Sequence, residues 1–209
     1  MHIYFVRHGE TLLNRAHVHQ SPTTLLSEKG KEQAREVGEM LREMNPDHLI
    51  TSEYVRAKET ATIIGECVGL TPIIHEDFYE IIRPSSLHGK SHFHPKSILY
   101  AFLTIWKYKE SEWHFEDAEN VTEMRARAQR ALQYLESCVG KQQSIVVVSH
   151  TIFIHGMVSY MCKKHIWGIL ELLLTALHVK QMKNTGIIHV EYTGAVMPYT
   201  CAWRTVEGV

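Results

Sequence analysis

The chain has 209 residues, of which 44% are hydrophobic, and its formal net charge at pH 7 is -1. A chain of this length can bury one sizeable core, so we expect a single domain over residues 1–209. The near-neutral charge provides no basic surplus for a nucleic-acid backbone or an anionic membrane surface, which excludes both as expected partners.

Strand-like and helix-like segments alternate along the chain. The strand-like runs are HIYFV (2–6), DHLITS (47–52), TPIIH (71–75), SIVVVSH (144–150), GIIHVEY (186–192) and TCAWRTV (200–206). This alternation is typical of an α/β fold in which helices cover both faces of a mainly parallel sheet. We therefore predict a three-layer α/β/α architecture with a mostly parallel sheet of about six strands.

Three segments between these runs show the apolar spacing of amphipathic helices. Their predicted buried faces are Ala34, Val37, Leu41 and Met44; Ala57, Ala61, Ile64 and Val68; and Val121, Met124, Ala128, Leu132 and Leu135. Asn120 precedes the third pattern and is followed by Glu123 three residues later, which predicts a capping box at the start of that helix.

Residues 85–118 are rich in histidine and aromatic side chains and form a longer connection than the fold needs. We predict that this segment is an insertion or lid that covers part of a site. Arg83, Lys90 and Lys96 lie in or beside it, and the sequence leaves open whether they bind a second anionic group or are simply solvated.

Basic side chains follow two of the predicted strands at the point where each strand ends. Arg7 and His8 follow the first strand, and His150 follows the strand that begins at Ser144. Ligands of open α/β sheets bind beyond the carboxyl ends of the strands, so neighbouring strands would direct both histidines at one small anion. The helix start after His150 would supply free N–H groups, and Gly9 would permit close approach of the backbone to the ligand.

The stretch TSEYVRAKET (51–60) adds a third group. Ser52 is predicted to cap a helix on which Arg56 and Thr60 share one face. An arginine near a helix N-terminus opposes the macrodipole at a cost of about 0.3–1 kcal/mol, which a bound anion would offset. Asn14, six residues after His8, is predicted either to form a turn or to donate a hydrogen bond to that anion.

In their order and spacing, these motifs resemble the histidine phosphatase superfamily, which includes the cofactor-dependent phosphoglycerate mutases. The residues that carry the resemblance are Arg7-His8-Gly9-Glu10-Thr11, Ser52, Arg56-Ala57, Thr60, Glu80 and Ser149-His150. The resemblance implies a phosphoglycerate mutase-like fold and phosphoryl transfer through a phosphohistidine on His8, without a metal or another cofactor.

The resemblance also implies a role for each matching residue. Arg7, His8, His150 and Glu80 are the implied catalytic residues, and Arg7, Asn14, Arg56, His150 and Thr151 are implied to hold the phosphoryl group. Glu80 would protonate the leaving oxygen and later accept a proton from water. Because Glu76, Asp77 and Glu10 are nearby carboxylates, they remain alternatives for this role.

Several positions depart from the family pattern. Thr151 stands where the family often has glycine, and the Trp-Glu-Gly that often follows the acid is replaced by RPSSLHGK (83–90). Mutase-like members usually have Trp before the Asn of the first motif and Arg after the acid, whereas this chain has Leu13 and Ile81. We therefore favour a metal-independent phosphomonoesterase, and keep a mutase-type phosphotransferase as the alternative.

Two alternatives of another class are a metal-binding protein and a phosphate-binding protein without turnover. Fifteen histidines include the pairs His17/His19 and His92/His94, whose spacing places both members on one face of a strand. The second alternative is disfavoured because His8, Arg7, Arg56 and His150 are all present.

The expected setting is the cytoplasm. The four cysteines form no Cys-x-x-Cys pair, and the chain starts with a strand rather than a basic and apolar leader. The expected partner is a small phosphate ester, and the sequence leaves a homodimer open.

Overall fold

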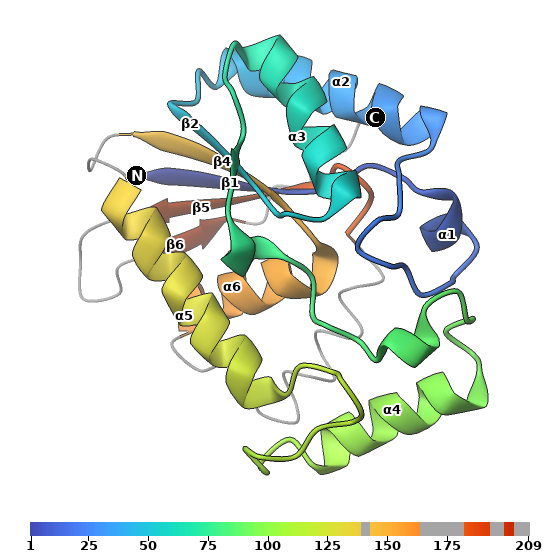
Figure 1. The fold of residues 1–209 in the computed structure, drawn as a ribbon. Helices are drawn as coiled ribbons and strands as arrows, with labels where there is room; N and C mark the ends of the chain where they lie inside the picture. Colours follow the sequence, from blue (N-terminus) through green and yellow to red (C-terminus); the bar gives the residue numbers. More distant parts are fainter. Residues whose placement is uncertain (139–142, 164–181, 193–198, 203–209) are drawn as a thin grey trace.

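The order of elements along the chain follows the predicted alternation (Figure 1). The computed structural model describes residues 1–138, 143–163, 182–192 and 199–202. The strands are β1 (His2–Arg7), β2 (His48–Thr51), β3 (Ile73–Ile74), β4 (Ser144–Ser149), β5 (Ile187–Tyr192) and β6 (Tyr199–Ala202). The helices are α1 (Leu12–Arg15), α2 (Glu28–Glu43), α3 (Val55–Val68), α4 (Pro95–Trp106), α5 (Val121–Cys138) and α6 (Thr151–Lys163), with short 3-10 turns η1 (Glu76–Phe78) and η2 (Ser85–Leu87).

The six strands form one sheet in the order β3-β2-β4-β1-β5-β6. The pairs β1/β4, β2/β4 and β2/β3 are parallel, whereas β5 pairs antiparallel with β1 and with β6. Arg7 lies opposite Ser149 in the β1/β4 pair, so these two strands end at the same edge. This confirms the predicted mostly parallel sheet and makes the strands before His8 and His150 neighbours.

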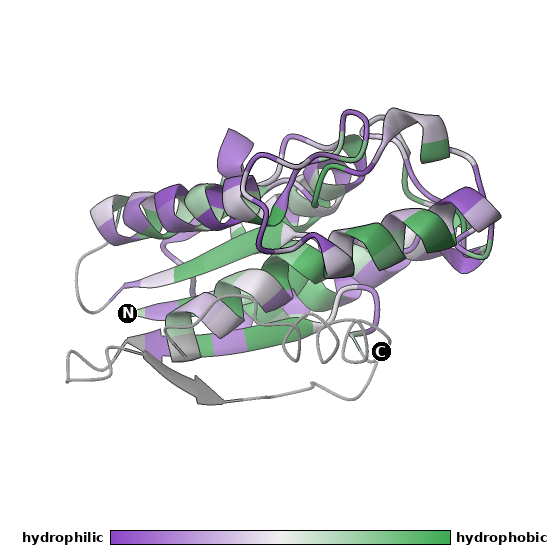
Figure 2. Ribbon diagram, turned by 90° about the horizontal axis from the view of Figure 1, so that it is seen from below, coloured by the Kyte–Doolittle hydropathy of each residue, from purple (hydrophilic) through white to green (hydrophobic). Residues whose placement is uncertain are grey.

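Each face of the sheet packs against its own pair of helices. Ile145 and Val147 of β4 pack with α5 and α6, while Val146 and Val148 of the same strand pack with α2 and α3. This alternation follows from the two-residue period of a strand. Figure 1 shows the two helical layers, and in Figure 2 the central strands are hydrophobic along most of their length. The predicted three layers are confirmed.

Most of the predicted helical faces are buried. Met44 is an exception, because α2 ends at Glu43 and Met44 is its 46% exposed C-cap. The capping box of α5 is confirmed: the backbone N–H of Glu123 donates to the Asn120 side chain, and that of Asn120 donates to the Glu123 carboxylate, both at 2.9 Å.

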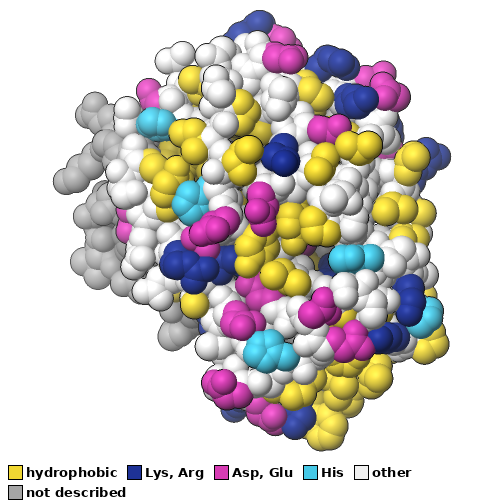
Figure 3. Space-filling model, viewed as in Figure 1, with side chains coloured by type: hydrophobic (Ala, Val, Ile, Leu, Met, Phe, Trp, Pro, Cys, Tyr) yellow, Lys and Arg dark blue, Asp and Glu magenta, His cyan; other side chains and the backbone are white. Residues whose placement is uncertain are grey.

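The segment from η2 to the start of α5 extends away from the sheet and has a small core of its own, made by Leu87, Tyr100, Phe115 and Ala118. The outer side of α4 exposes Ile98, Leu99, Phe102 and Trp106, and Figure 3 shows hydrophobic side chains gathered over this helix.

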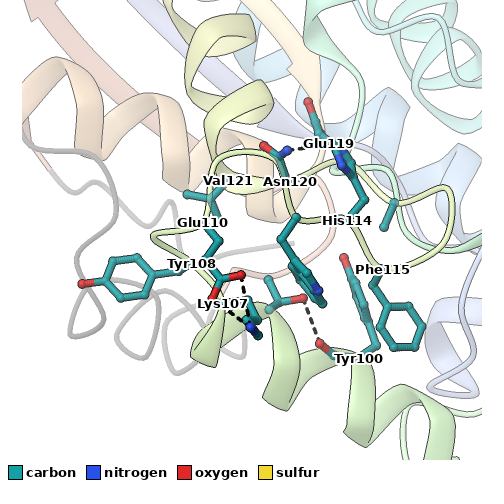
Figure 4. Close-up of a pocket in the computed structure, with 12 residues that line it drawn as sticks. Tyr100, Lys107, Tyr108, Glu110, His114, Phe115, Glu119, Asn120 and Val121 are labelled. Carbon is teal, nitrogen blue, oxygen red and sulfur yellow. Dashed lines mark hydrogen bonds and ion pairs between the residues drawn. The ribbon is translucent and has the colours of Figure 1, made fainter.

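A small pocket lies where this segment meets the start of α5 (Figure 4). Its interior has room for about one water molecule, at about 10 Å³. Around it, Asn120 donates from Nδ2 to the Ser111 carbonyl oxygen at 2.8 Å and contacts His114 Nε2 at 3.0 Å. The pocket is therefore a small packing gap between α4 and α5 rather than a ligand site.

Candidate active site

A cavity of about 590 Å³ lies beyond the carboxyl ends of β1, β2 and β4. Its inner end is carried by strand ends and by α1 and α3, and includes Arg7, His8, Asn14 and Arg56. Its outer end is carried by the loop segments 17–20 and 83–93, and includes Arg83, His17, His88 and His92. Glu80 and Thr151 also line the cavity.

His8 is buried with one ring nitrogen committed to the backbone. Its Nδ1 lies 2.7 Å from the carbonyl oxygen of Gly9, and because a carbonyl only accepts, Nδ1 carries the proton. Nε2 then keeps its lone pair, toward which Arg56 Nε donates at 3.3 Å. Burial, followed by the positive charges of Arg56 and Arg7, lowers the pKa of His8 well below its ordinary value. The ring is therefore a neutral imidazole whose unprotonated Nε2 accepts a hydrogen bond from Arg56.

Gly9 holds His8 in place through close backbone packing. A Cβ at Gly9 would lie 2.4 Å from the carbonyl oxygen of Gly30, at the start of α2. The Gly9 N–H donates to Thr60 Oγ1 at 3.0 Å, and this hydroxyl donates to the Arg56 carbonyl at 2.7 Å. The close approach that Gly9 permits is thus to the backbone of α2, which corrects the expected approach to a ligand.

Two arginines bring positive charge to the inner end. Arg56 is 3% exposed, donates from Nη1 to the Ser21 carbonyl at 3.0 Å and lies over the Tyr54 ring. Burial lowers its pKa to about 10, so it stays protonated at neutral pH. Arg7 donates from Nη1 to the Met182 carbonyl at 2.5 Å, while its buried Nε has no hydrogen-bond partner within the described chain.

Asn14 takes part in a turn and also has a donor to spare. Its Oδ1 accepts from the Thr11 N–H at 3.0 Å, which forms a capping box at the start of α1. Its Nδ2 is buried, lacks a partner among the described atoms, and belongs to a residue that lines the cavity. The two predicted roles of Asn14 are therefore compatible, because its Oδ1 stabilises the turn while its Nδ2 remains available to donate to an anion.

The His150 ring lies beside that of His8, with ring centroids 5.2 Å apart, and His150 is fully buried. Its Nε2 lies 2.9 Å from Ser52 Oγ, and that hydroxyl accepts from the Tyr54 N–H at 3.2 Å. If the Ser52 proton points at Nε2, then Nδ1 of His150 is the protonated nitrogen. This Nδ1 is buried and finds no partner in the described structure. Burial and nearby positive charge, first that of Arg56, lower the pKa of His150.

The contact between Ser52 and His150 corrects the predicted capping role of Ser52. The helix α3 begins at Val55, its N-cap is Tyr54, and no side chain caps it. Ser52 sits instead in the turn after β2, fully buried against His150. Local sequence suits a cap here, but the neighbouring strand β4 brings an imidazole within reach of the hydroxyl.

Glu80 occupies the start of α6. Its carboxylate accepts from the N–H groups of Ile81 (3.0 Å), Phe153 (3.1 Å) and Ile152 (3.3 Å). The expectation that the helix start after His150 leaves free N–H groups for a phosphate is wrong for Ile152 and Phe153, because Glu80 takes both. A carboxylate at this position also complements the helix dipole.

Two of the four carboxylates considered for the acid role line the cavity, and two do not. Glu80 and Glu10 line it, whereas Glu76 and Asp77 do not. Asp77 is buried in an ion pair with Arg130, at 2.7 Å. Glu10 accepts from the Ser27 hydroxyl at 3.2 Å and lies 3.9 Å from Lys29 Nζ.

Sequence reasoning missed the pair that holds the Glu80 segment. Arg127 of α5 is 1% exposed and makes a bidentate ion pair with Glu119, at 2.8 and 2.7 Å. It also donates to the carbonyls of Asp77 (3.1 Å) and Tyr79 (2.8 Å), while the N–H of Glu119 donates to the Ile82 carbonyl. The signal was available, because Arg127 lies between Met124 and Ala128 of the apolar face.

The metal-binding alternative finds no support in the part of the chain that the structure describes. There, no group of three or more histidine, cysteine or acidic side chains is arranged to hold a metal ion. His17 and His92 do approach each other, with centroids 6.5 Å apart, and His19 lies 4.4 Å from His92. Within the described residues there is also no helix of the length and apolarity that a membrane crossing requires.

The chain is similar to both mutases and phosphatases. A probable phosphoglycerate mutase of Erwinia tasmaniensis is 28% identical over 199 residues, which cover 92% of this chain and 85% of that protein. An uncharacterized phosphatase of Bacillus subtilis is 40% identical over 79 residues, 37% of this chain and 41% of that protein. The structure of a mycobacterial glucosyl-3-phosphoglycerate phosphatase superposes with a TM-score of 0.77 at 20% identity, covering 98% of this chain and 99% of that one.

A family model supports the same relationship over nearly the whole chain. The model of the histidine phosphatase superfamily (branch 1) matches residues 3–196, a range that includes the two strand ends, the Arg56 helix and Glu80. The chain therefore belongs to the histidine phosphatase superfamily.

Proposed function

We propose that this chain hydrolyses small phosphate monoesters through a phosphohistidine formed on His8. The observation that carries the proposal is the state of the His8 ring. Nδ1 is held by the Gly9 carbonyl, and Nε2 keeps its lone pair beside Arg56 in a cavity open to a ligand. A neutral imidazole with a fixed tautomer is the form of histidine that acts as a nucleophile.

In the first step, Nε2 of His8 attacks phosphorus, and the bond from phosphorus to the ester oxygen breaks. The charge on the transferring group is balanced by Arg7 and Arg56. Asn14 Nδ2 donates to its oxygens, and so does His150 Nδ1 in the tautomer in which Ser52 donates to Nε2. Thr151 borders the same space. Glu80 gives a proton to the leaving oxygen, which departs as an alcohol.

In the second step, water attacks the phosphorus of phospho-His8 and gives a proton to Glu80. The bond between phosphorus and Nε2 breaks, inorganic phosphate leaves, and His8 returns to its neutral form. In this sequence, Glu80 acts first as an acid and then as a base, and each step is balanced without a metal ion or cofactor.

The test is to trap the intermediate. Rapid quenching with a ³²P-labelled phosphate ester should yield an acid-labile phosphoenzyme in the parent protein and none in His8→Ala, whose turnover should fall to background. His48→Ala removes a histidine of β2 that does not line the cavity and serves as the control. Because His8 is buried, a melting curve checks that the variant folds. Full activity of a folded His8→Ala protein would exclude the mechanism.

The mutase-type alternative is tested with the same protein. A mutase would pass the phosphoryl group from phospho-His8 to a second hydroxyl rather than to water. Leu13 and Ile81 replace the residues typical of mutase-like members, which supports hydrolysis. Net release of phosphate from 3-phosphoglycerate, measured against its conversion to 2-phosphoglycerate, separates the two reactions.

We also propose that residues 1–209 form one domain in which segment 85–118 acts as a lid. Ser85, His88, His92, Phe93 and Asp117 line the cavity, which supports this role. A cytoplasmic setting is proposed because Cys67 and Cys138 are free thiols.

A further inference from the structure

The outer end of the cavity carries an arginine that the phosphohistidine chemistry does not use. Arg83 lies three residues after Glu80 and lines the same cavity as His8 and Arg56. After burial, the positive charge of Arg83 also lowers the pKa of Arg56, so the two guanidinium groups lie close enough to interact electrostatically.

Arg83 is held in position by a neutral histidine. Its Nη1 lies 3.0 Å from Nδ1 of His19, and since a guanidinium only donates, Nδ1 is the acceptor. His19 then carries its proton on Nε2, which lies 3.0 Å from Ser97 Oγ, and that hydroxyl donates to the Ser91 carbonyl at 2.9 Å. Burial and Arg83 itself lower the pKa of His19 to about 3, so this partner stays uncharged at neutral pH.

This arrangement fixes Arg83 without neutralising it. Within the described residues, no carboxylate forms an ion pair with Arg83. The acidic side chains of the cavity have other contacts, because Asp117 accepts from the Ser85 N–H at 3.0 Å and Glu80 accepts from α6. Among the described residues, His19 is the acceptor that the Arg83 guanidinium meets, so four of the five N–H donors of Arg83 remain for a ligand.

The other cations that the sequence offered for this role are placed differently. Lys96 forms an ion pair with Glu116, and neither Lys96 nor Lys90 lines the cavity. Lys90 contributes its backbone, since its carbonyl accepts from the N–H of His19. The isolated bridge between Val18 and Ser91 then ties the His19 segment to the segment that follows Arg83. Arg83 is therefore the cation of segment 83–96 that faces the substrate space.

We propose that Arg83 binds a second anionic group of the substrate, so that the preferred substrates are phosphate monoesters that also carry a carboxylate or a second phosphate. The proposal rests on the proposed function. The inner end would hold the phosphoryl group that is transferred, and Arg83 would bind the part of the same substrate that extends into the outer end. A guanidinium fixed at one nitrogen presents its remaining donors as a fork, which matches the two oxygens of a carboxylate or phosphate. His19 and Ser97 act as positioning residues for Arg83.

The test compares substrate pairs that differ in the second charge. The pairs are 3-phosphoglycerate against glycerol 3-phosphate, for a carboxylate, and fructose 1,6-bisphosphate against fructose 6-phosphate, for a phosphate. The parent protein should favour the doubly anionic member of one pair by about 10- to 100-fold in kcat/KM, the range of a charge-assisted hydrogen bond. Whichever pair shows the preference identifies the anionic group.

Arg83→Ala should abolish that preference and leave hydrolysis of 4-nitrophenyl phosphate, which has no second anion, within about threefold of the parent value. Ser97→Ala should weaken the preference in the same direction by a smaller factor, because it removes the acceptor that fixes the tautomer of His19. Arg42→Ala, in an exposed pair with Glu39 on α2, is the matched control and should change neither substrate class.

The outcomes separate this proposal from the proposed function. If the parent hydrolyses 4-nitrophenyl phosphate but shows no preference in either pair, or if Arg83→Ala retains the preference, the second-anion site is excluded. If the parent hydrolyses none of the esters, the proposed function fails. Calorimetric titration of the same pairs then tests Arg83 alone, and equal affinity of parent and Arg83→Ala for the doubly anionic members would overturn its role.

Discussion

The two ends of the cavity are built by different parts of the fold. The inner end rests on β1, β4 and α3, where His8, Arg56 and His150 are at most 3% exposed and are held by backbone carbonyls or by a serine. The outer end rests on loops and on a segment with its own small core, where Phe93 is 75% exposed.

This difference in structure is suited to a division between bond breaking at the inner end and substrate selection at the outer end. Side chains at the ends of paired strands keep their positions because the sheet and both helical layers restrain them. Loops can change in sequence at little cost to the core. We infer that the inner end determines which bond is broken, and the outer end determines which ester is accepted. Glu80 lies where the two ends meet, in the connection between η1 and η2.

Among the variants that test this comparison of the two ends, a change at Glu80 is expected to have the largest effect on the rate of phosphoryl transfer. Glu80→Gln removes the proton that an alkyl leaving group needs, so phosphoryl transfer from an alkyl phosphate should slow by about 10²- to 10⁴-fold. An activated aryl phosphate should lose much less in this step, because its phenolate leaves unaided. The comparison is pre-steady-state phenol release against steady-state turnover, in parent and variant.

Equal losses on both esters would show that Glu80 is not the leaving-group acid. Glu10 would then be the carboxylate to test, since it is the other alternative that lines the cavity. A Glu76→Gln variant is a suitable control, because this carboxylate lies two residues before Phe78 at an exposed position outside the cavity.

A smaller effect is expected from the pair that positions Glu80. Replacing Arg127 alone would leave Glu119 charged and buried, at a cost of about 3–5 kcal/mol of stability. The double variant Arg127→Met with Glu119→Leu avoids this cost. It removes the side-chain hydrogen bonds to the backbone of Asp77, Tyr79 and Ile82, on both sides of Glu80, and keeps the backbone bond between Glu119 and Ile82. We expect kcat on an alkyl phosphate to fall by about 10-fold, with a smaller loss on an aryl phosphate.

The selectivity of this loss distinguishes positioning from general destabilisation. A melting curve should show that the double variant keeps a stable fold. If both esters lose activity equally while the fold is intact, the pair supports the structure as a whole and has no specific action on Glu80.

The smallest effect is expected from metal removal. Arg7 and Arg56 supply positive charge at the inner end, so dialysis against a chelator should leave kcat unchanged within error. Turnover that stops on chelation and returns with zinc would contradict this prediction, and would show that the arginines do not suffice to balance the transferring charge.

The sequence by itself determined the architecture and the inner end. Alternating apolar runs fixed the layers, because a strand with both faces apolar must be covered on both sides. His8, Arg56 and His150 were identified because their motifs lie at strand ends and at the first turn of a helix, where local rules place side chains at the sheet edge. Such features depend on short stretches of chain.

Only the tertiary structure decided which partners these groups have. Ser52 meets His150 through the pairing of β2 with β4, and Glu80 accepts from the N–H groups of Ile152 and Phe153, which lie 72 and 73 positions later in the sequence. His19 fixes Arg83 because the segments 17–20 and 83–93 lie side by side. These contacts join residues far apart in the chain, and no local propensity or periodicity encodes the distance between two such side chains.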